Sequence, residues 1–308
     1  HSRLSIIDLY ERSNQPFSFN NVTLIFNGEI YNYKELREKL ETKGHIFFTD
    51  SDTEVLLKAY IEYGDECVNH FNGMWAFSIW DNNKKKLLLS RDRFAEKPLY
   101  YFKDNNGFYF ASEIKAIQSL LQKKLPINYD HIKRHLVYGY KFLYKTPETF
   151  FQGIREIEYA SNVTLDCNIN FTQSKYWKPE SNINDMTLDE AVEGSRHHLL
   201  ESVKLRLRAD VPLAFCLSGG VDSASLASIA KKEFNYDVAT FSIIDPDERY
   251  NELENIQATI DDLDCKHFLV HLNFENMLER LEALVAYHDS PVSTISYLVH
   301  SMLSEKIS

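Results

Sequence analysis

The sequence predicts two domains of different fold class, an α+β domain followed by an α/β domain. Residues 1–180 hold short β-rich runs that helical patterns interrupt, which is typical of mostly antiparallel sheets with segregated helices. From residue 181 onwards, apolar strands alternate with helical patterns, as in βαβ units on a parallel sheet. The length of 308 residues also suits two domains. We therefore expect domains at 1–180 and 181–308.

In the first domain, helices are predicted at 33–43 and at 53–63. Ser51 and Glu54 have the spacing of a capping box at the start of the second helix. The strands are expected in four runs, VTLIFNGEIYN (22–32), NGMWAFSIWD (72–81), KKLLLSRDRF (85–94) and KPLYYFKDNNGFYFAS (97–112), of which the last contains a hairpin turn, DNNG. From about 122 to 186 the pattern loosens, and we interpret this stretch as the end of the domain and a long connector.

The second domain begins with a capping box, Thr187 and Glu190, which predicts a helix that ends near Arg208. Strands and helices then alternate. The strands are expected at LAFCLS (213–218), YDVATFSI (236–243) and KHFLVHL (266–272), and the helices at VDSASLASIAKK (221–232), NELENIQATIDDL (251–263) and NMLERLEALVAYH (276–288).

Composition excludes several classes of function. The formal net charge of −11 and the pI near 5.5 argue against nucleic acid as the main partner. No apolar stretch reaches membrane-spanning length, so no membrane association is expected. The four cysteines are scattered and form no CxxC pair, which favours neither a zinc site nor a disulfide framework. A reducing cytoplasm is therefore the expected location.

The stretch SGGVDS (218–223) lies between a predicted strand and a predicted helix. Backbone N–H groups in such a turn can cradle an anion, and Gly219 and Gly220 would let a phosphate lie against bare backbone. The hydroxyls of Ser218 and Ser223 could donate to it, and Asp222 could hold Mg²⁺. The alternative is a tight strand-to-helix turn in which Asp222 or Ser223 caps the helix.

Two sets of motifs resemble known families. LSGGVDSASLA (217–227) looks like the signature of the PP-loop ATP pyrophosphatases. Six stretches are similar, in order, to the class II glutamine amidotransferase domain: RLSIIDL (3–9), FNGEIYNYKELR (26–37), SDTEVLLKAY (51–60), NGMWAFSIWD (72–81), RDRF..KPLYY (91–101) and FASEIKAI (110–117). Together they resemble the glutamine-dependent asparagine synthetase family. This implies layered antiparallel sheets of the N-terminal-nucleophile type, then a PP-loop parallel sheet.

The resemblance implies roles for residues of the first domain, which would hydrolyse glutamine. Asn27 and Gly28 would form the oxyanion hole, because a tetrahedral oxyanion needs preorganised donors. Arg3 would clamp the glutamine carboxylate, and Glu29 and Asp52 would meet its amino group. Ile6 and Ile7 would line the same pocket. Two alternatives stay open, since Asn27-Gly28 could be a mere turn and Asp52 could belong to the helix cap.

For the second domain the resemblance implies ATP, Mg²⁺ and an acceptor carboxylate, with aspartate as the first expectation. Main chain near Leu217 and near Ile243 would bind adenine. The phosphates would lie on the loop, and Asp222 would hold the metal. The expected ATP-binding residues are Leu217, Ser218, Gly219, Gly220, Val221, Asp222, Ser223 and Ile243. A homodimer is compatible with this architecture.

The match also has gaps. The family's nucleophile is an amino-terminal cysteine, but no cysteine precedes Cys67, which we interpret as a buried small hydrophobic residue. A second acidic motif would follow Ser308. We therefore expect a fragment that lacks both ends. Two alternatives remain at this stage. The acceptor could be another carboxylate, such as a surface-polysaccharide sugar acid, or the first domain could be an inactive structural or glutamine-sensing unit.

Overall fold

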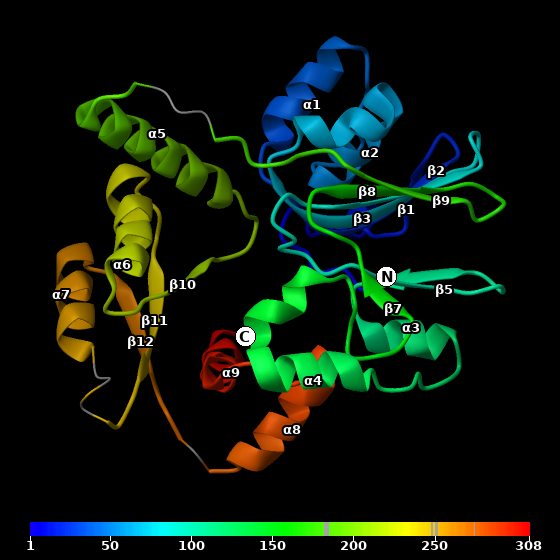
Figure 1. Ribbon diagram of the computed structural model, residues 1–308. Helices are drawn as coiled ribbons and strands as arrows, with labels where there is room; N and C mark the ends of the chain where they lie inside the picture. The colour runs from blue at the N-terminus through cyan, green and yellow to red at the C-terminus, as the bar shows by residue number, and fades with distance from the viewer. Residues whose placement is uncertain (182–184, 248, 250–251, 274) are drawn as a thin grey trace. The chain divides into compact units, whose positions relative to one another are not determined.

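The computed structural model describes residues 1–181, 185–247, 249, 252–273 and 275–308 (Figure 1). The chain divides into two compact units, His1–Asn182 and Ile183–Ser308, which are described separately below as unit 1 and unit 2.

Unit 1 consists of four layers, in the order helices, sheet, sheet, helix (Figure 1). A six-stranded sheet has the strand order β1-β2-β3-β4-β8-β9, and a three-stranded sheet has the order β6-β5-β7. All pairings in both sheets are antiparallel. The strands are β1 Phe17–Phe19, β2 Val22–Ile30, β3 Gly73–Asp81, β4 Lys86–Arg91, β5 Tyr100–Lys103, β6 Phe108–Ala111, β7 Ile154–Glu156, β8 Ser161–Leu165 and β9 Phe171–Lys175. This confirms the predicted α+β class.

Helices α1 and α2 cover one face of the six-stranded sheet. Apolar side chains of both helices and of β2 and β3 form the main core, which includes Leu36, Leu40, Leu56 and Trp75. A second cluster, around Leu89 and Val163, lies between the two sheets, and a third packs α3 on the small sheet. The helices of unit 1 are α1 Tyr33–Thr42, α2 Asp52–Tyr63, α3 Ile114–Leu120 and α4 Tyr129–Tyr138, with short 3-10 helices at Glu11–Ser13, Gly64–His70 and Tyr140–Lys145.

Most of 122–186 does form the end of unit 1, but its interpretation as a long connector was wrong. This stretch holds α4, β7, β8 and β9, and β8 pairs with β4 in the six-stranded sheet. The sequence of β9, FTQSK, is mostly polar, and its side chains are half-buried or exposed because this strand lies at the edge of the sheet. Such strands carry little of the alternating signal on which the prediction depended.

Unit 2 contains a three-stranded parallel sheet with the order β10-β11-β12, as the sequence predicts. A core cluster that includes Val203, Ala227 and Leu263 packs α5, α6 and α7 together, and α9 contacts β11 and β12. The elements are α5 Leu188–Arg206, β10 Ala214–Cys216, α6 Val221–Ser228, a π-helical turn Ile229–Glu233, β11 Ala239–Ile244, α7 Leu253–Leu263, β12 Lys266–His271, α8 Met277–His288 and α9 Ile295–Ile307.

The start of α5 has the geometry that its sequence predicts. The Thr187 hydroxyl accepts from the Glu190 N–H, and the Glu190 carboxylate accepts from the Thr187 N–H, so both halves of the capping box are present.

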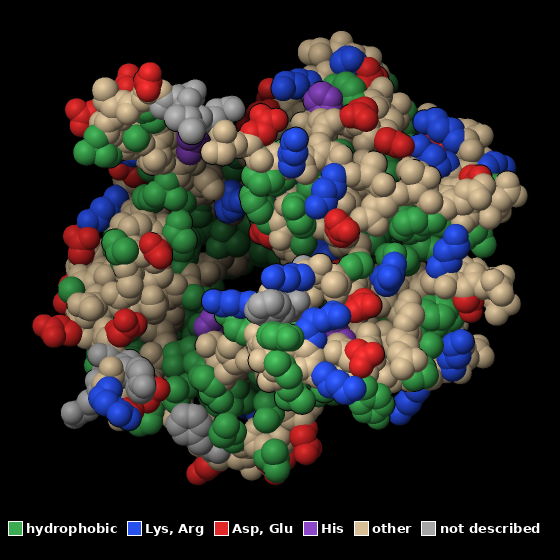
Figure 2. All heavy atoms as spheres, viewed as in Figure 1, with side chains coloured by type: hydrophobic (Ala, Val, Ile, Leu, Met, Phe, Trp, Pro, Cys, Tyr) green, Lys and Arg blue, Asp and Glu red, His purple; other side chains and the backbone are tan. Residues whose placement is uncertain are grey.

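On the face of unit 1 drawn in Figure 2, acidic and basic side chains are interspersed, and neither charge forms a large patch. Among the described residues, no helix combines the length and apolar character needed to cross a bilayer.

Candidate active site

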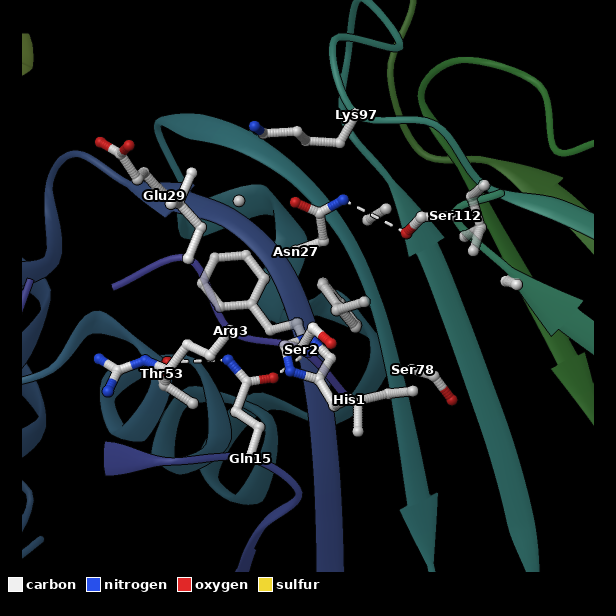
Figure 3. A pocket seen from close by; sticks show the side chains of 18 of the residues that line it. His1, Ser2, Arg3, Gln15, Asn27, Glu29, Thr53, Ser78, Lys97 and Ser112 are labelled. Carbon is white, nitrogen blue, oxygen red and sulfur yellow. Dashed lines mark hydrogen bonds between the residues drawn. The ribbon is translucent and has the colours of Figure 1, made fainter. Parts of the chain in front are cut away.

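Unit 1 contains a pocket of about 510 Å³ between its two sheets and the amino-terminal segment (Figure 3). The pocket is lined by all seven residues that were predicted to bind glutamine: Arg3, Ile6, Ile7, Asn27, Gly28, Glu29 and Asp52. Ile7 is buried and belongs to the main core, and Ile6 packs against it. The structure therefore brings together residues that are up to 49 positions apart in the chain, from Arg3 to Asp52.

Asn27 and Gly28 lie within β2, which excludes the alternative that this pair only forms a turn. They pair with Ala76 and Trp75 of β3. A Cβ atom added to Gly28 would lie 2.1 Å from the Met74 carbonyl oxygen and 2.8 Å from the Trp75 Cα, and the Gly28 φ is +155°. Only glycine fits at this point of the strand. The pocket thus meets bare backbone beside Asn27.

The Asn27 side chain is fixed from the other sheet. Its Nδ2 donates to the Ser112 Oγ at 3.2 Å (Figure 3). Ser112 follows β6 of the small sheet and also lines the pocket. The hydrogen bond therefore joins the two sheets at the pocket wall.

Two carboxylates of the pocket are stabilised in their protonated form. The pKa of Asp52 is raised from 3.8 to about 7, mainly by burial and further by the charge of Glu29. The N–H of Ile30, which donates to the Asp52 Oδ2 at 3.0 Å, opposes this shift. Burial also raises the pKa of Glu29, and the ammonium of Lys97 offsets part of that rise. A cationic ligand between these carboxylates would favour their ionised form.

Asp52 is the first residue of α2 and does not cap it. The cap is Ser51, whose hydroxyl accepts from the Glu54 N–H at 3.2 Å. The Glu54 carboxylate does not complete a capping box, because it accepts from the N–H groups of Phe48 and Thr49 instead. The Asp52 side chain is therefore available to the pocket, which favours the site role over the capping role.

Arg3 is positioned by its own segment of chain. Its Nη2 donates to the carbonyl oxygens of Ile7 at 2.7 Å and Asp8 at 2.8 Å, and its Nη1 donates to that of Tyr10 at 3.5 Å. A guanidinium has five N–H donors, so part of its capacity remains for an anion. These contacts orient the side chain along one wall of the pocket.

Several polar residues of the pocket were missed as candidates, and Lys97 and Ser112 are two of them. Lys97 and Ser112 both lie in stretches that carry the amidotransferase resemblance, KPLYY and FASE. A lysine or a serine in such a run is not distinctive by itself, and only the folding of the small sheet onto β2 brings them to the site.

Cys67 does not belong to the pocket. It is fully buried in the main core, and burial together with the neighbouring Asp65 raises the pKa of its thiol. This agrees with its interpretation as a small hydrophobic residue. None of the described residues that line the pocket is a cysteine.

In unit 2, the glycine loop follows β10 and ends at the start of α6. Leu217 is buried, and its N–H donates to the Phe241 carbonyl oxygen at 2.8 Å. Ile243 is half-buried at the carboxyl end of β11, beside the same edge of the sheet. Ligands of open parallel sheets bind at this edge. Leu217 and Ile243 are therefore close enough to the loop to belong to one site.

The loop is held by the two serines. The Ser223 Oγ accepts from the Ser218 N–H at 3.0 Å and lies 2.9 Å from the Ser218 Oγ, which itself accepts from the Gly220 N–H at 3.2 Å. Gly220, which has no side chain, is the N-cap of α6. The Ser223 hydroxyl contacts Ser218 and donates to the Gly220 carbonyl oxygen at 3.2 Å. Val221 and Asp222 are exposed at the first turn.

Glu252 covers the first glycine of the loop. Its Oε2 accepts from the Gly219 N–H at 3.1 Å, and a Cβ at Gly219 would lie 2.5 Å from the Glu252 Cβ. The absence of a side chain at Gly219 thus makes room for a carboxylate of the same chain. Glu252 was not among the predicted site residues, and it lies 33 positions from Gly219.

No cluster of three or more metal-ligating side chains occurs in the parts of the chain that the structure describes. Asp222 is an exposed carboxylate at the loop. Because Mg²⁺ is usually bound by one or two carboxylates together with substrate phosphates, Asp222 alone fits a metal that arrives with a nucleotide.

The comparisons with known proteins match both units of the chain. Residues 1–177 match the glutamine amidotransferase domain, and residues 194–308 match the asparagine synthase family. Asparagine synthetase [glutamine-hydrolyzing] 1 of Bacillus subtilis is 36% identical over 94% of this chain and 45% of its own length. A putative asparagine synthetase [glutamine-hydrolyzing] 2 of Methanocaldococcus jannaschii is 32% identical over 96% of this chain and 60% of its own length. Amidase chry2 of Gibberella zeae is 29% identical over the whole chain and 48% of its own length.

The fold and the matches define a protein with an amidotransferase unit followed by an asparagine synthase unit. This chain belongs to the glutamine-hydrolysing asparagine synthetase family. It spans about half the length of the curated relatives that it matches.

Proposed function

We propose that the protein is an ATP-dependent, amide-forming ligase that takes its nitrogen from glutamine. Glutamine and water give glutamate and ammonia in unit 1. In unit 2, aspartate and ATP give an aspartyl adenylate and pyrophosphate. Ammonia then displaces AMP to give asparagine. The observation that carries this proposal is the convergence of all seven predicted glutamine-binding residues on one pocket of a chain that belongs to this family.

In unit 1, each end of glutamine would meet a complementary group. The Glu29 and Asp52 carboxylates would bind the α-ammonium, which would shift both towards their ionised forms. Arg3 would hold the α-carboxylate with those N–H groups of its guanidinium that do not donate to the backbone carbonyl oxygens of its own segment. The carbonyl oxygen of the side-chain amide would lie against the Asn27 Nδ2 and the Gly28 N–H, which would stabilise the oxyanion that develops there. The nucleophile is not assigned to any described residue.

In unit 2, we propose that ATP binds at the carboxyl edge of the parallel sheet. Leu217 and Ile243 would contact the adenine, and the loop 218–223 would receive the phosphates at the start of α6. Asp222 would hold Mg²⁺ against them, which would neutralise charge on the phosphates. We further propose a cytoplasmic location, where glutamine and ATP are available. We also propose that the protein is a homodimer, and light scattering of the purified protein tests this.

The test is product analysis of the full-length natural protein with glutamine, ATP, Mg²⁺ and aspartate. We expect glutamate, AMP, pyrophosphate and asparagine in equal amounts. AMP formation that requires a different carboxylate would correct the acceptor, and glutamate formation without any AMP would contradict the ligase assignment.

A further inference from the structure

Asn27 and Ser112 form a hydrogen bond at the wall of the pocket, and this bond affects how the side-chain amide of Asn27 is oriented. Asn27 comes from the centre of β2 in the six-stranded sheet, and Ser112 comes from the connection between β6 and α3. They are 85 positions apart in the chain, and both are half-buried. Their hydrogen bond of 3.2 Å is therefore a tertiary contact within unit 1 and not a feature of local geometry.

The backbone at Asn27 fixes where its side chain begins but not how its amide is turned. The strand pairing with Ala76 holds the Cα of Asn27, and the terminal torsion of an asparagine side chain is broad. The amide is planar and carries two N–H groups on one nitrogen. Once one N–H is donated to the Ser112 Oγ, the direction of the second N–H is determined as well.

This direction matters because the pocket needs a donor rather than an acceptor. An oxyanion donor works only if it is preorganised at the position where negative charge develops. An asparagine that turned by half a revolution would present its carbonyl oxygen there and would repel the charge. Ser112 also lines the pocket, so its hydroxyl lies on the wall where such a preference can be imposed.

We propose that Ser112 is a positioning residue for glutamine hydrolysis, which acts by holding the Asn27 amide with its nitrogen towards the reacting carbonyl. The inference rests on the proposed function of this pocket. Ser112 itself need not touch glutamine, and its effect passes through Asn27. It should therefore influence the rate of the chemical step more than the binding of glutamine.

The experiment compares three variants of the full-length natural protein. Ser112→Ala removes the hydroxyl, and Ser112→Thr keeps it. Ser119→Ala removes an exposed hydroxyl from the helix that follows, and it serves as the matched control. For each protein, kcat and KM for glutamine hydrolysis are measured, together with amide synthesis from added ammonium and the thermal unfolding midpoint.

We expect Ser112→Ala to lower kcat for glutamine by roughly tenfold, less than the loss of an oxyanion donor itself, with KM nearly unchanged. Ser112→Thr should recover most of the loss, and Ser119→Ala should resemble the unaltered protein. Synthesis from ammonium and the unfolding midpoint should not change.

Two results would overturn the inference while leaving the proposed function in place. One is an unchanged kcat in Ser112→Ala. The other is a loss that Ser112→Thr does not recover, or that is accompanied by an equal loss of ammonium-supported synthesis, since either would show a merely structural role. If the unaltered protein formed no glutamate at all, the proposed function itself would fall, and the positioning role with it.

Discussion

The Gly219 N–H donates to the Glu252 Oε2 at 3.1 Å, so a carboxylate of the chain itself lies on the loop that we assign to phosphate. Glu252 is exposed and immediately precedes α7. A phosphate that used the Gly219 N–H would have to displace this carboxylate and would be repelled by it.

We therefore expect Glu252→Gln to strengthen ATP binding, by roughly three- to tenfold in Kd, because a competing charged acceptor is removed. Isothermal titration with ATP, without and with Mg²⁺, measures the effect. Glu254→Gln, in the first turn of α7, is the control, since Glu254 is also exposed and the Gly219 N–H donates to Glu252. Weaker binding in the Glu252 variant, confined to the titration with Mg²⁺, would show instead that Glu252 assists the metal.

Asp52 should make the stability of the unliganded protein depend on pH. Its pKa is raised from the ordinary 3.8 to about 7 in the folded protein, mainly by burial, so the folded state holds a proton that the unfolded state releases. This contribution is fully present below about pH 4 and is lost as the pH rises through 7. Asp52→Asn, which cannot ionise, should remove this part of the decline in urea-unfolding midpoints between pH 4 and 8.

The exposed Asp130 provides the control for that series, and Asp130→Asn should keep the decline of the unaltered protein. A decline in Asp52→Asn as large as that of the unaltered protein would mean that Asp52 is already ionised in the folded protein.

Gly28→Ala should destabilise unit 1, since the new Cβ would lie 2.1 Å from the Met74 carbonyl oxygen and force β2 away from β3. Overpacking of this kind costs about 1–3 kcal/mol in unfolding free energy. Gly107→Ala is the matched control, because its Cβ would meet the Tyr109 ring at an ordinary 3.5 Å. Denaturant titration of both variants measures the difference, and equal stabilities would contradict the close approach at Gly28.

Arg3→Lys keeps a positive charge but loses the planar fork, so we expect a sharp rise in KM for glutamine. Synthesis from added ammonium should be spared, because it does not use the pocket of unit 1. If both activities fell together, the bonds from Arg3 to the carbonyls of Ile7 and Asp8 would be its main role.

The elements that the sequence predicts well are those whose own residues determine them. α2 begins after Ser51, whose hydroxyl caps it, and the hairpin at 104–107 forms because the Asp104 side chain accepts from the N–H groups of Asn106 and Gly107. The resemblance to a family then supplied seven pocket residues, and the structure brings these to one cavity.

What could not be predicted depends on contacts between distant parts of the chain. The partner of Asn27 lies 85 positions away, and the partner of Gly219 lies 33 positions away in a stretch without a motif. Prediction also failed for a residue whose partners are close in the sequence: the Glu54 carboxylate accepts from the N–H groups of Phe48 and Thr49 and does not close the predicted capping box. Side-chain hydrogen bonds of this kind leave no periodic signal in the sequence.

The most direct test of the account follows the nitrogen atom. The full-length natural protein is given glutamine labelled with ¹⁵N in the side-chain amide, together with ATP, Mg²⁺ and aspartate but no added ammonium, and the product is analysed by mass spectrometry. We predict asparagine that carries ¹⁵N, in an amount that matches the AMP formed. Asparagine without the label, or AMP formation without asparagine, would contradict the claim that this family member joins glutamine hydrolysis to amide synthesis.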